Sequence, residues 1–308
     1  MAHRNVIVLE GGGAKGPYEM GVLTVLEKKL QKPIKDFTSL VVSTSVGAII
    51  GSLVCTGKKS AEAWSTMFLD KLPYVFKKRG WFFPLPVYDA THYKDCYEEY
   101  VGKNFLMRDL AVWLMCTSVD RCEPRPHFFK SWEKEDGALY VADTVMLSFS
   151  APYFFGATID EKNRKIWLDG GMSYNNLPLM KAYIEILLQG WLKNGDTVHI
   201  LAVGSGRPDT SVSFDKAKKR GIIGQTVDQI KKYLDITDGG LTREMASLEQ
   251  VRNMKAIMKS TPNLTCQWID WADMPKQLDK MDDVRDRFVY YAKGIEDGNA
   301  IDKGLFKC

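Results

Sequence analysis

Near its N-terminus the chain has a short apolar strand that runs into three glycines. Residues 5–16 read Asn-Val-Ile-Val-Leu-Glu-Gly-Gly-Gly-Ala-Lys-Gly, and a helical pattern follows directly. Such a strand-to-helix turn aims free backbone N–H groups at one place, where an anion can bind. The anion can be a bound phosphate or the oxygen that becomes negative during acyl transfer. The turn therefore predicts an anion site, and the rest of the chain must identify the anion.

A second strand-to-helix turn carries a serine. Residues 37–42 are mainly apolar and read Phe-Thr-Ser-Leu-Val-Val. Residues 43–47 read Ser-Thr-Ser-Val-Gly, and residues 48–54 continue as a buried helix pattern. A serine in such a turn, with small neighbours, is typical of a nucleophile elbow. Ser45 is the candidate nucleophile and Gly47 supports the turn, whereas Ser43 lies two residues earlier at the strand end. Taken alone, Ser45 is explained equally well as an ordinary small turn residue.

A third turn supplies a carboxylate. Residues 165–168 predict a strand that ends in Asp169-Gly170-Gly171, and the two glycines leave Asp169 uncrowded, where it can face Ser45. A serine hydroxyl needs a base that takes its proton as it attacks a carbonyl group. Asp169 is the candidate base, although an aspartate that only forms a turn before glycine is common.

These motifs, in this order, resemble those of the patatin-like phospholipases and acyl hydrolases. The resemblance covers about residues 5–205 and includes residues 148–154 and Asn175-Asn176. It departs from the family pattern at two positions. Ser43 stands where the elbow usually has glycine, and Leu177 is inserted before Pro178. Neither departure removes a reacting group.

The resemblance implies an α/β fold of three layers, with a mostly parallel central sheet and helices on both faces. It implies a Ser45–Asp169 dyad without histidine, an acyl-enzyme on Ser45, and phospholipid as the substrate class. The oxyanion hole would be formed by Gly11, Gly12 and Gly13.

Composition is consistent with one domain over 1–308, with the motif-bearing core at 5–205 and a mainly helical part at 206–308. No leader or membrane-span pattern is recognised, so we expect a cytoplasmic protein, for which peripheral contact with a membrane is one of two open interpretations of residues 77–88. The net charge of +4 does not indicate nucleic-acid binding. No metal site or cofactor is expected, and no feature indicates an oligomeric state. The cysteines are expected to be free thiols; they are Cys55, Cys96, Cys116, Cys122, Cys266 and Cys308.

Apolar periodicity extends the α/β pattern along the chain. The repeated strand–helix–strand connections indicate a mostly parallel sheet, with the reacting loops gathered after its strand ends. We predict strands at about 5–9, 37–43, 112–118, 165–169, 198–204 and 264–269, and helices at about 17–30, 46–56, 60–72, 89–101, 142–150, 178–192, 221–258 and 282–298.

Two other functions remain open on the sequence alone. Residues 11–16 match the Gly-x-Gly-x-x-Gly pattern of nucleotide sites, so a catalytically silent lipid- or nucleotide-binding protein of the same fold is one alternative. A Ser-Asp-His triad esterase using His199 is another, although His199 lies inside a predicted strand. We interpret Lys15 as a solvated loop charge rather than a ligand of a phosphate head group, and His127 as a packed loop residue.

Residues 77–88 are the candidate for membrane contact. Lys77, Lys78 and Arg79 precede Trp81, Phe82 and Phe83, and prolines nearby prevent a long regular element. Aromatic and basic side chains together favour a membrane interface. Burial of the aromatic side chains against the core explains the segment equally well.

Overall fold

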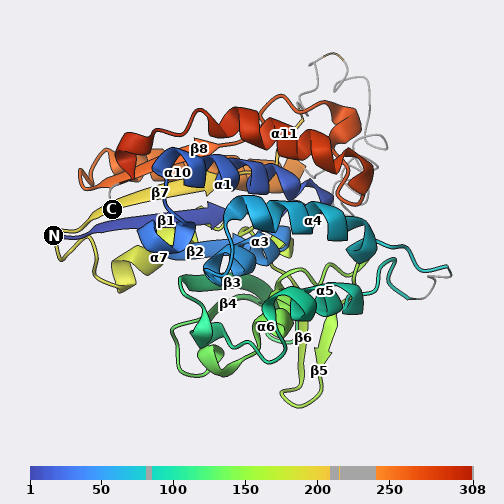
Figure 1. The fold of residues 1–308 in the computed structure, drawn as a ribbon. Helices are drawn as coiled ribbons and strands as arrows, with labels where there is room; N and C mark the ends of the chain where they lie inside the picture. Colours follow the sequence, from blue (N-terminus) through green and yellow to red (C-terminus); the bar gives the residue numbers. More distant parts are fainter. Residues whose placement is uncertain (81–84, 209–214, 216–240, 307–308) are drawn as a thin grey trace.

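The computed structural model describes residues 1–80, 85–208, 215 and 241–306 (Figure 1). Its centre is one sheet of eight strands in the order β5-β6-β3-β2-β1-β7-β8, with β4 paired to the other side of β3. The strands are β1 (His3–Leu9), β2 (Thr38–Thr44), β3 (Trp113–Asp120), β4 (Arg125–Lys130), β5 (Thr158–Asp160), β6 (Lys165–Asp169), β7 (Thr197–Val203) and β8 (Leu264–Ile269).

Helices cover both faces of the sheet and make three layers. The described helices are α1 (Pro17–Leu30), α2 (Ile34–Phe37), α3 (Val46–Cys55), α4 (Ala61–Val75), α5 (Thr91–Val101), α6 (Val141–Ser148), α7 (Leu179–Leu188), α10 (Leu241–Met258) and α11 (Arg287–Gly298). Alternate residues of β1 separate the two cores: Ile7 and Leu9 pack with α1, α3 and α4, whereas Val6 and Val8 pack with α7 and α10. The expected three-layer α/β fold is therefore confirmed.

The sheet has a parallel part and an antiparallel part. Strands β3, β2, β1, β7 and β8 are parallel neighbours, as predicted. Strands β4 and β6 run antiparallel to β3, and β5 runs antiparallel to β6. Strands β4 and β5 were not predicted from the sequence. The prediction that His127 is a packed loop residue was wrong, because His127 belongs to β4.

Most predicted helices appear with shifts of a few residues at their ends. Helix α4 starts where predicted, because the Ser60 side chain accepts a hydrogen bond from the Ala63 amide and caps its N-terminus. Helix α11 begins at Arg287 rather than at 282, after a short 3-10 turn. The predicted helical stretch 221–240 lies outside the described residues. The five described cysteines, all except Cys308, are free.

Close packing of α1 against α11 joins the C-terminal part of the chain to its first helix, and α11, α1 and α4 lie side by side (Figure 1). Glycines permit the contact. A Cβ atom added at Gly21 would lie 2.4 Å from the Tyr291 carbonyl oxygen, and one at Gly294 would lie 2.0 Å from that of Tyr18. Both neighbours are backbone atoms of the facing helix, so a side chain would push the helices apart.

We therefore predict that Gly294→Ala destabilises the fold. Overpacking of a close contact costs about 1–3 kcal/mol, which exceeds the gain of about 1 kcal/mol in helix propensity. Urea unfolding followed by circular dichroism measures the change. Gly80→Ala is the control, because an added Cβ there meets no atom of the described residues within 4 Å. Equal midpoints for the two variants would contradict the packing account.

Candidate active site

Strand β3 brings the candidate nucleophile and the candidate base together. On one side of β3, Thr44 at the end of β2 pairs with Thr117. Asp169 at the end of β6 pairs with Ser118, the next residue of β3. Strand β4 occupies the other side of β3, so β6 continues along the same side where β2 stops. Ser45 and Asp169 therefore meet at the edge of the sheet although β6 runs antiparallel.

Ser45 occupies a strained turn between β2 and α3. Its φ and ψ are 54° and −123°, a conformation that side chains rarely adopt. The Ser45 amide donates a 2.9 Å hydrogen bond to Ser148 Oγ, and the hydroxyl donates one of 2.7 Å to Asp169 Oδ2. Gly47 leaves room for the turn, since an added Cβ would lie 2.8 Å from the Glu10 carbonyl oxygen. The geometry is that of a nucleophile elbow.

Asp169 is fixed through both carboxylate oxygens. While Oδ2 accepts from Ser45, Oδ1 accepts a 2.7 Å hydrogen bond from the Gly171 amide. The side chain is buried, as is that of Ser45. Gly170 must lack a side chain, because a Cβ there would lie 2.1 Å from Thr117 Oγ1. The carboxylate thus has one oxygen held by the turn and the other aimed at the serine hydroxyl.

The glycine loop offers fewer free donors than the sequence predicts. The Gly11 amide already donates a 3.0 Å hydrogen bond to the Asn176 carbonyl oxygen, so it is not a free donor for an oxyanion. The amides of Gly12 and Gly13 have no protein acceptor within the described part of the chain. Gly13 has φ +57°, which favours glycine. Gly12 and Gly13 therefore remain as donors.

Two residues near Ser45 were not singled out from the sequence. Val46 is the first residue of α3, so its N–H lacks a partner within the helix and lies directly after the candidate nucleophile. Ser148 accepts the Ser45 amide and is fully buried. The strand-to-helix pattern could have indicated Val46, and the run 148–154 already pointed to Ser148 without giving its role.

Lys15 is not a solvated charge, and that prediction was wrong. Its Nζ is buried and donates hydrogen bonds of 2.9 Å to Asp279 Oδ1 and 3.1 Å to the Gly206 carbonyl oxygen. A buried ammonium group needs such partners, because desolvation of an unpaired charge is costly. Lys15 is therefore engaged within the protein rather than available to a lipid head group.

His199 lies away from the dyad. It pairs with Asn5 in the sheet, whereas the end of β7 is Val203, four residues or about 13 Å further along the strand. The His199 Nδ1 atom is 2.9 Å from Thr265 Oγ1, and its ring packs against Phe306. Burial lowers the pKa of His199 to about 4. The structure thus does not assemble a triad through this residue.

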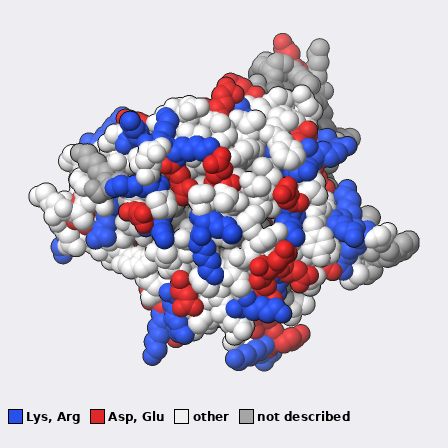
Figure 2. Space-filling model, in the orientation of Figure 1, with Lys and Arg blue, Asp and Glu red and all other residues white. Residues whose placement is uncertain are grey.

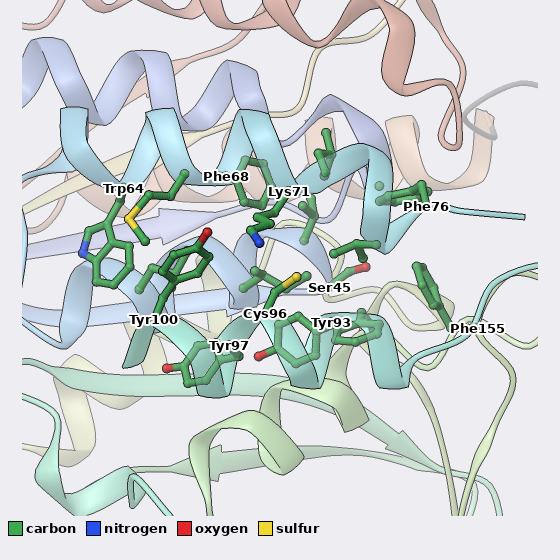
Figure 3. A pocket seen from close by; sticks show the side chains of 18 residues that line it. Ser45, Trp64, Phe68, Lys71, Phe76, Tyr93, Cys96, Tyr97, Tyr100 and Phe155 are labelled. Carbon is green, nitrogen blue, oxygen red and sulfur yellow. The ribbon is translucent and has the colours of Figure 1, made fainter. Parts of the chain in front are cut away.

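An apolar cavity opens beside Ser45 (Figure 3). It has a volume of about 670 Å³, including its open mouth, and lies between α3, α4 and α5. In Figure 3 the side chain of Trp64 lies at the end remote from Ser45, and those of Phe76 and Phe155 lie near the serine. The cavity is lined mainly by apolar and aromatic side chains, among them Leu53, Phe68, Leu72, Tyr93, Tyr97 and Phe149.

The proposed membrane segment is only partly described. Lys78 Nζ lies 3.9 Å from Asp282 and Arg79 lies 3.1 Å from Asp89, so two of its three cations have acidic neighbours. Trp81, Phe82 and Phe83 lie outside the described residues. Figure 2 shows basic and acidic side chains interspersed over this face of the molecule. Among the described residues, no helix is long and apolar enough to cross a bilayer, and no cluster of three metal-binding side chains occurs.

Known proteins resemble this chain over most of its length. It is 27% identical over 235 residues to a cGAMP-activated phospholipase of Escherichia coli (strain TW11681), in a match that covers 70% of this chain and 65% of that protein, just under two thirds of its length. It is 24% identical over 292 residues to a cGAMP-activated phospholipase of Vibrio cholerae, covering 84% of this chain and 82% of that protein. The solved structure of VipD from Legionella pneumophila aligns with 99% of this chain and 67% of its own, with a TM-score of 0.47 and 12% identity.

A family model described as patatin-like phospholipase matches residues 7–183, which is more than half of the sequence. The matched region includes the glycine loop, the Ser45 turn and Asp169. The chain therefore belongs to the patatin-like phospholipase family.

Proposed function

We propose that this chain is a phospholipase of type A, which hydrolyses carboxylic esters of phospholipids through an acyl-enzyme on Ser45. The 2.7 Å hydrogen bond from Ser45 to Asp169 beside an apolar cavity is the observation that carries the proposal. The family membership supports the same class of substrate. We further propose that 1–308 works as one domain, because β8 extends the common sheet and α11 packs against α1.

The chemistry follows from the positions of the groups. Asp169 takes the proton of Ser45 Oγ as the oxygen attacks the ester carbonyl carbon. The carbonyl oxygen becomes negative and accepts hydrogen bonds from the amides of Gly12, Gly13 and Val46. When the bond to the leaving alcohol breaks, Asp169 returns the proton to that alcohol, which departs as a lysophospholipid. Water then attacks the acyl-enzyme, with Asp169 again as the base, and releases the fatty acid and free Ser45.

The cavity beside Ser45 is suited to the fatty acyl chain. Its lining is almost entirely apolar, so a chain that enters it leaves water at a gain of about 0.8 kcal/mol for each buried methylene. A nucleotide or other polar ligand would gain little there. This contrast favours lipid hydrolysis over the catalytically silent nucleotide-binding alternative.

We also propose that a cyclic dinucleotide switches the activity on. The support is the names of the relatives from Escherichia coli and Vibrio cholerae, both called cGAMP-activated phospholipases. Activity measurements therefore need to include a panel of cyclic dinucleotides, because the chain alone can be silent until the activator binds.

Contact with the bilayer through residues 77–83 remains a proposal that rests on their sequence. Lys77 precedes the two cations that have acidic neighbours, and we expect its charge to attract anionic lipid. Aromatic side chains at 81–83 would enter the interface.

Replacing either member of the dyad should abolish turnover. We expect Ser45→Ala and Asp169→Asn each to lower kcat on phospholipid vesicles and on a soluble ester by at least about 1,000-fold, and the double variant to be no worse, because the two groups act as one unit. A fluorophosphonate probe should label the wild type at Ser45, and not the Ser45→Ala variant. His199→Asn is the control and should retain kcat.

Two outcomes would contradict this assignment. Full activity of Ser45→Ala would show that Ser45 is not the nucleophile. Loss of kcat in a folded His199→Asn protein would favour the Ser-Asp-His triad. A wild-type chain that neither reacts with the probe nor hydrolyses lipid, with every cyclic dinucleotide of the panel, would favour the silent binding protein.

Trp64 at the remote end of the cavity should limit acyl chain length. Trp64→Leu opens space there, so kcat/KM should shift toward longer esters, by about fourfold for each methylene that becomes buried. A series of p-nitrophenyl esters measures the shift. Trp191→Leu is the matched control, because Trp191 is also buried but packs on the opposite face of the sheet. An unchanged profile in Trp64→Leu would place the acyl chain elsewhere.

The aromatic residues at 81–83 should matter only for lipid in a bilayer. Changing all three to Ser should weaken binding to anionic vesicles and slow hydrolysis of vesicle lipid, while turnover of a soluble ester persists. The electrostatic contribution to vesicle binding should weaken as the salt concentration rises, since exposed charges are screened over about 10 Å at 0.1 M salt. As a control, Leu187→Ser with Leu188→Ser removes exposed apolar side chains from α7. Equal loss of both activities at 81–83 would show that these residues pack in the core.

A further inference from the structure

Two buried charges bracket the glycine loop. Glu10 directly precedes Gly11, and Lys15 follows Gly13 by two residues; both side chains are buried. We infer that Glu10 and Lys15 are positioning residues, through which the C-terminal part of the chain, at residues 205, 206, 247, 279 and 281, holds the oxyanion donors in place. The inference rests on the proposed function of the loop and concerns residues to which that function assigns no role.

Glu10 ties the start of the loop to three other segments. Its Oε2 accepts a 3.0 Å hydrogen bond from the Ser205 amide, just beyond β7. Its Oε1 accepts from Ser247 Oγ of α10 at 2.5 Å and from Asn176 Nδ2 at 3.2 Å. The same Asn176 amide group donates to the Gly11 carbonyl oxygen at 3.0 Å, and Ser205 Oγ donates to that oxygen at 3.3 Å. The Glu10 carboxylate thus positions Asn176 and Ser205, the two residues whose side chains donate hydrogen bonds to the Gly11 carbonyl oxygen.

Lys15 ties the end of the loop to the C-terminal part. Its Nζ binds Asp279 and the Gly206 carbonyl oxygen. The neighbouring Ala14 amide donates a 2.7 Å hydrogen bond to the Met281 carbonyl oxygen. That oxygen would lie 2.2 Å from a Cβ added at Gly13, so the backbone at Met281 packs directly on the glycine whose amide is free.

These contacts lie at both ends of the glycine loop, so they can affect the reaction rate through the position of the oxyanion donors. An oxyanion hole works only if its donors lie 2.7–3.1 Å from the place where the negative oxygen develops, and a misplacement of about 1 Å can cost about 100-fold in rate. Gly12 and Gly13 have no side chains of their own to hold them. Their placing therefore depends on the residues at either end of the loop. One partner of these residues, Asn176, lies inside the region 7–183 that matches the family. The other partners, at 205, 206, 247, 279 and 281, lie outside it.

The test weakens the partners in the C-terminal part and leaves the loop sequence intact. Ser247→Ala removes one donor to Glu10, and Asp279→Asn removes the charge opposite Lys15. We expect kcat on a soluble ester to fall at least about tenfold in each, with KM within about twofold, because the donors act on charge that exists only in the transition state. The rate of labelling by a fluorophosphonate should fall in parallel.

A matched control separates positioning from stability. Glu185 is also a buried glutamate, but it lies in α7, and its partners, Lys130 of β4 at 2.8 Å and Gln189, do not belong to the glycine loop. Glu185→Gln should lower the thermal midpoint and leave kcat unchanged. The double change Lys15→Met with Asp279→Leu replaces the buried ion pair by apolar groups. It should recover thermal stability relative to Asp279→Asn without recovering kcat.

Unchanged kcat in both Ser247→Ala and Asp279→Asn would overturn the inference, as would recovery of kcat together with stability in the double variant. Ser247→Ala removes only one hydroxyl group, so it keeps the test decisive if Asp279→Asn fails to fold. Ser45→Ala in the same assay distinguishes failure of the proposed function from failure of the positioning role. If Ser45→Ala is active, the proposed function fails. If it is inert while the C-terminal variants keep full kcat, only the positioning role fails.

Discussion

The pairing of β3 with two successive strands on one side is the constraint on which the site depends. Strand β2 ends opposite Thr117 and β6 ends opposite Ser118, so the residues at these two strand ends become neighbours. The described chain between them includes four α-helices and three strands, β3 among them. The pairing of residues 118–120 of β3 with β6 nevertheless decides the contact. Gly170 protects that register, because any side chain there would collide with Thr117. The serine and the carboxylate are thus placed by the sheet rather than by flexible loops.

The elbow stores strain that other parts of the structure offset. A residue held at φ 54° and ψ −123° costs on the order of 1–3 kcal/mol, and Ser45 keeps this conformation with its amide bound to Ser148. The buried charges of Glu10 and Lys15 add a second cost, which their hydrogen-bond partners offset. The strain lies in the Ser45 turn, and the two buried charges flank the glycine loop, so both costs fall on the two turns of the candidate site. Such costs are typical of a site whose geometry is maintained for chemistry.

The sequence predicted the parallel core of the fold because those strands are buried on both faces and are followed by helices with clear periodicity. It missed β4, since Pro124 and Pro126 beside His127 are typical of a loop, and an edge position tolerates such residues. It identified the Ser45 and Asp169 turns from local glycines, but it could not give the direction of β6. The prediction that Lys15 is a solvated charge was wrong, because its partner Asp279 lies 264 residues away in the sequence and no local pattern indicates the contact. Local motifs therefore indicated which residues could react, and long-range contacts decided which backbone amides are free.

The most direct test of the account is to trap the acyl-enzyme. A wild-type sample is mixed with a p-nitrophenyl ester in the presence of the panel of cyclic dinucleotides and quenched in acid within the first turnover. It is then digested and analysed by mass spectrometry. The account predicts one acyl group per chain, on the peptide that contains Ser45, together with a burst of p-nitrophenol of the same size. A covalent acyl group on another residue, or hydrolysis with neither burst nor adduct, would contradict the assignment of Ser45 as the nucleophile.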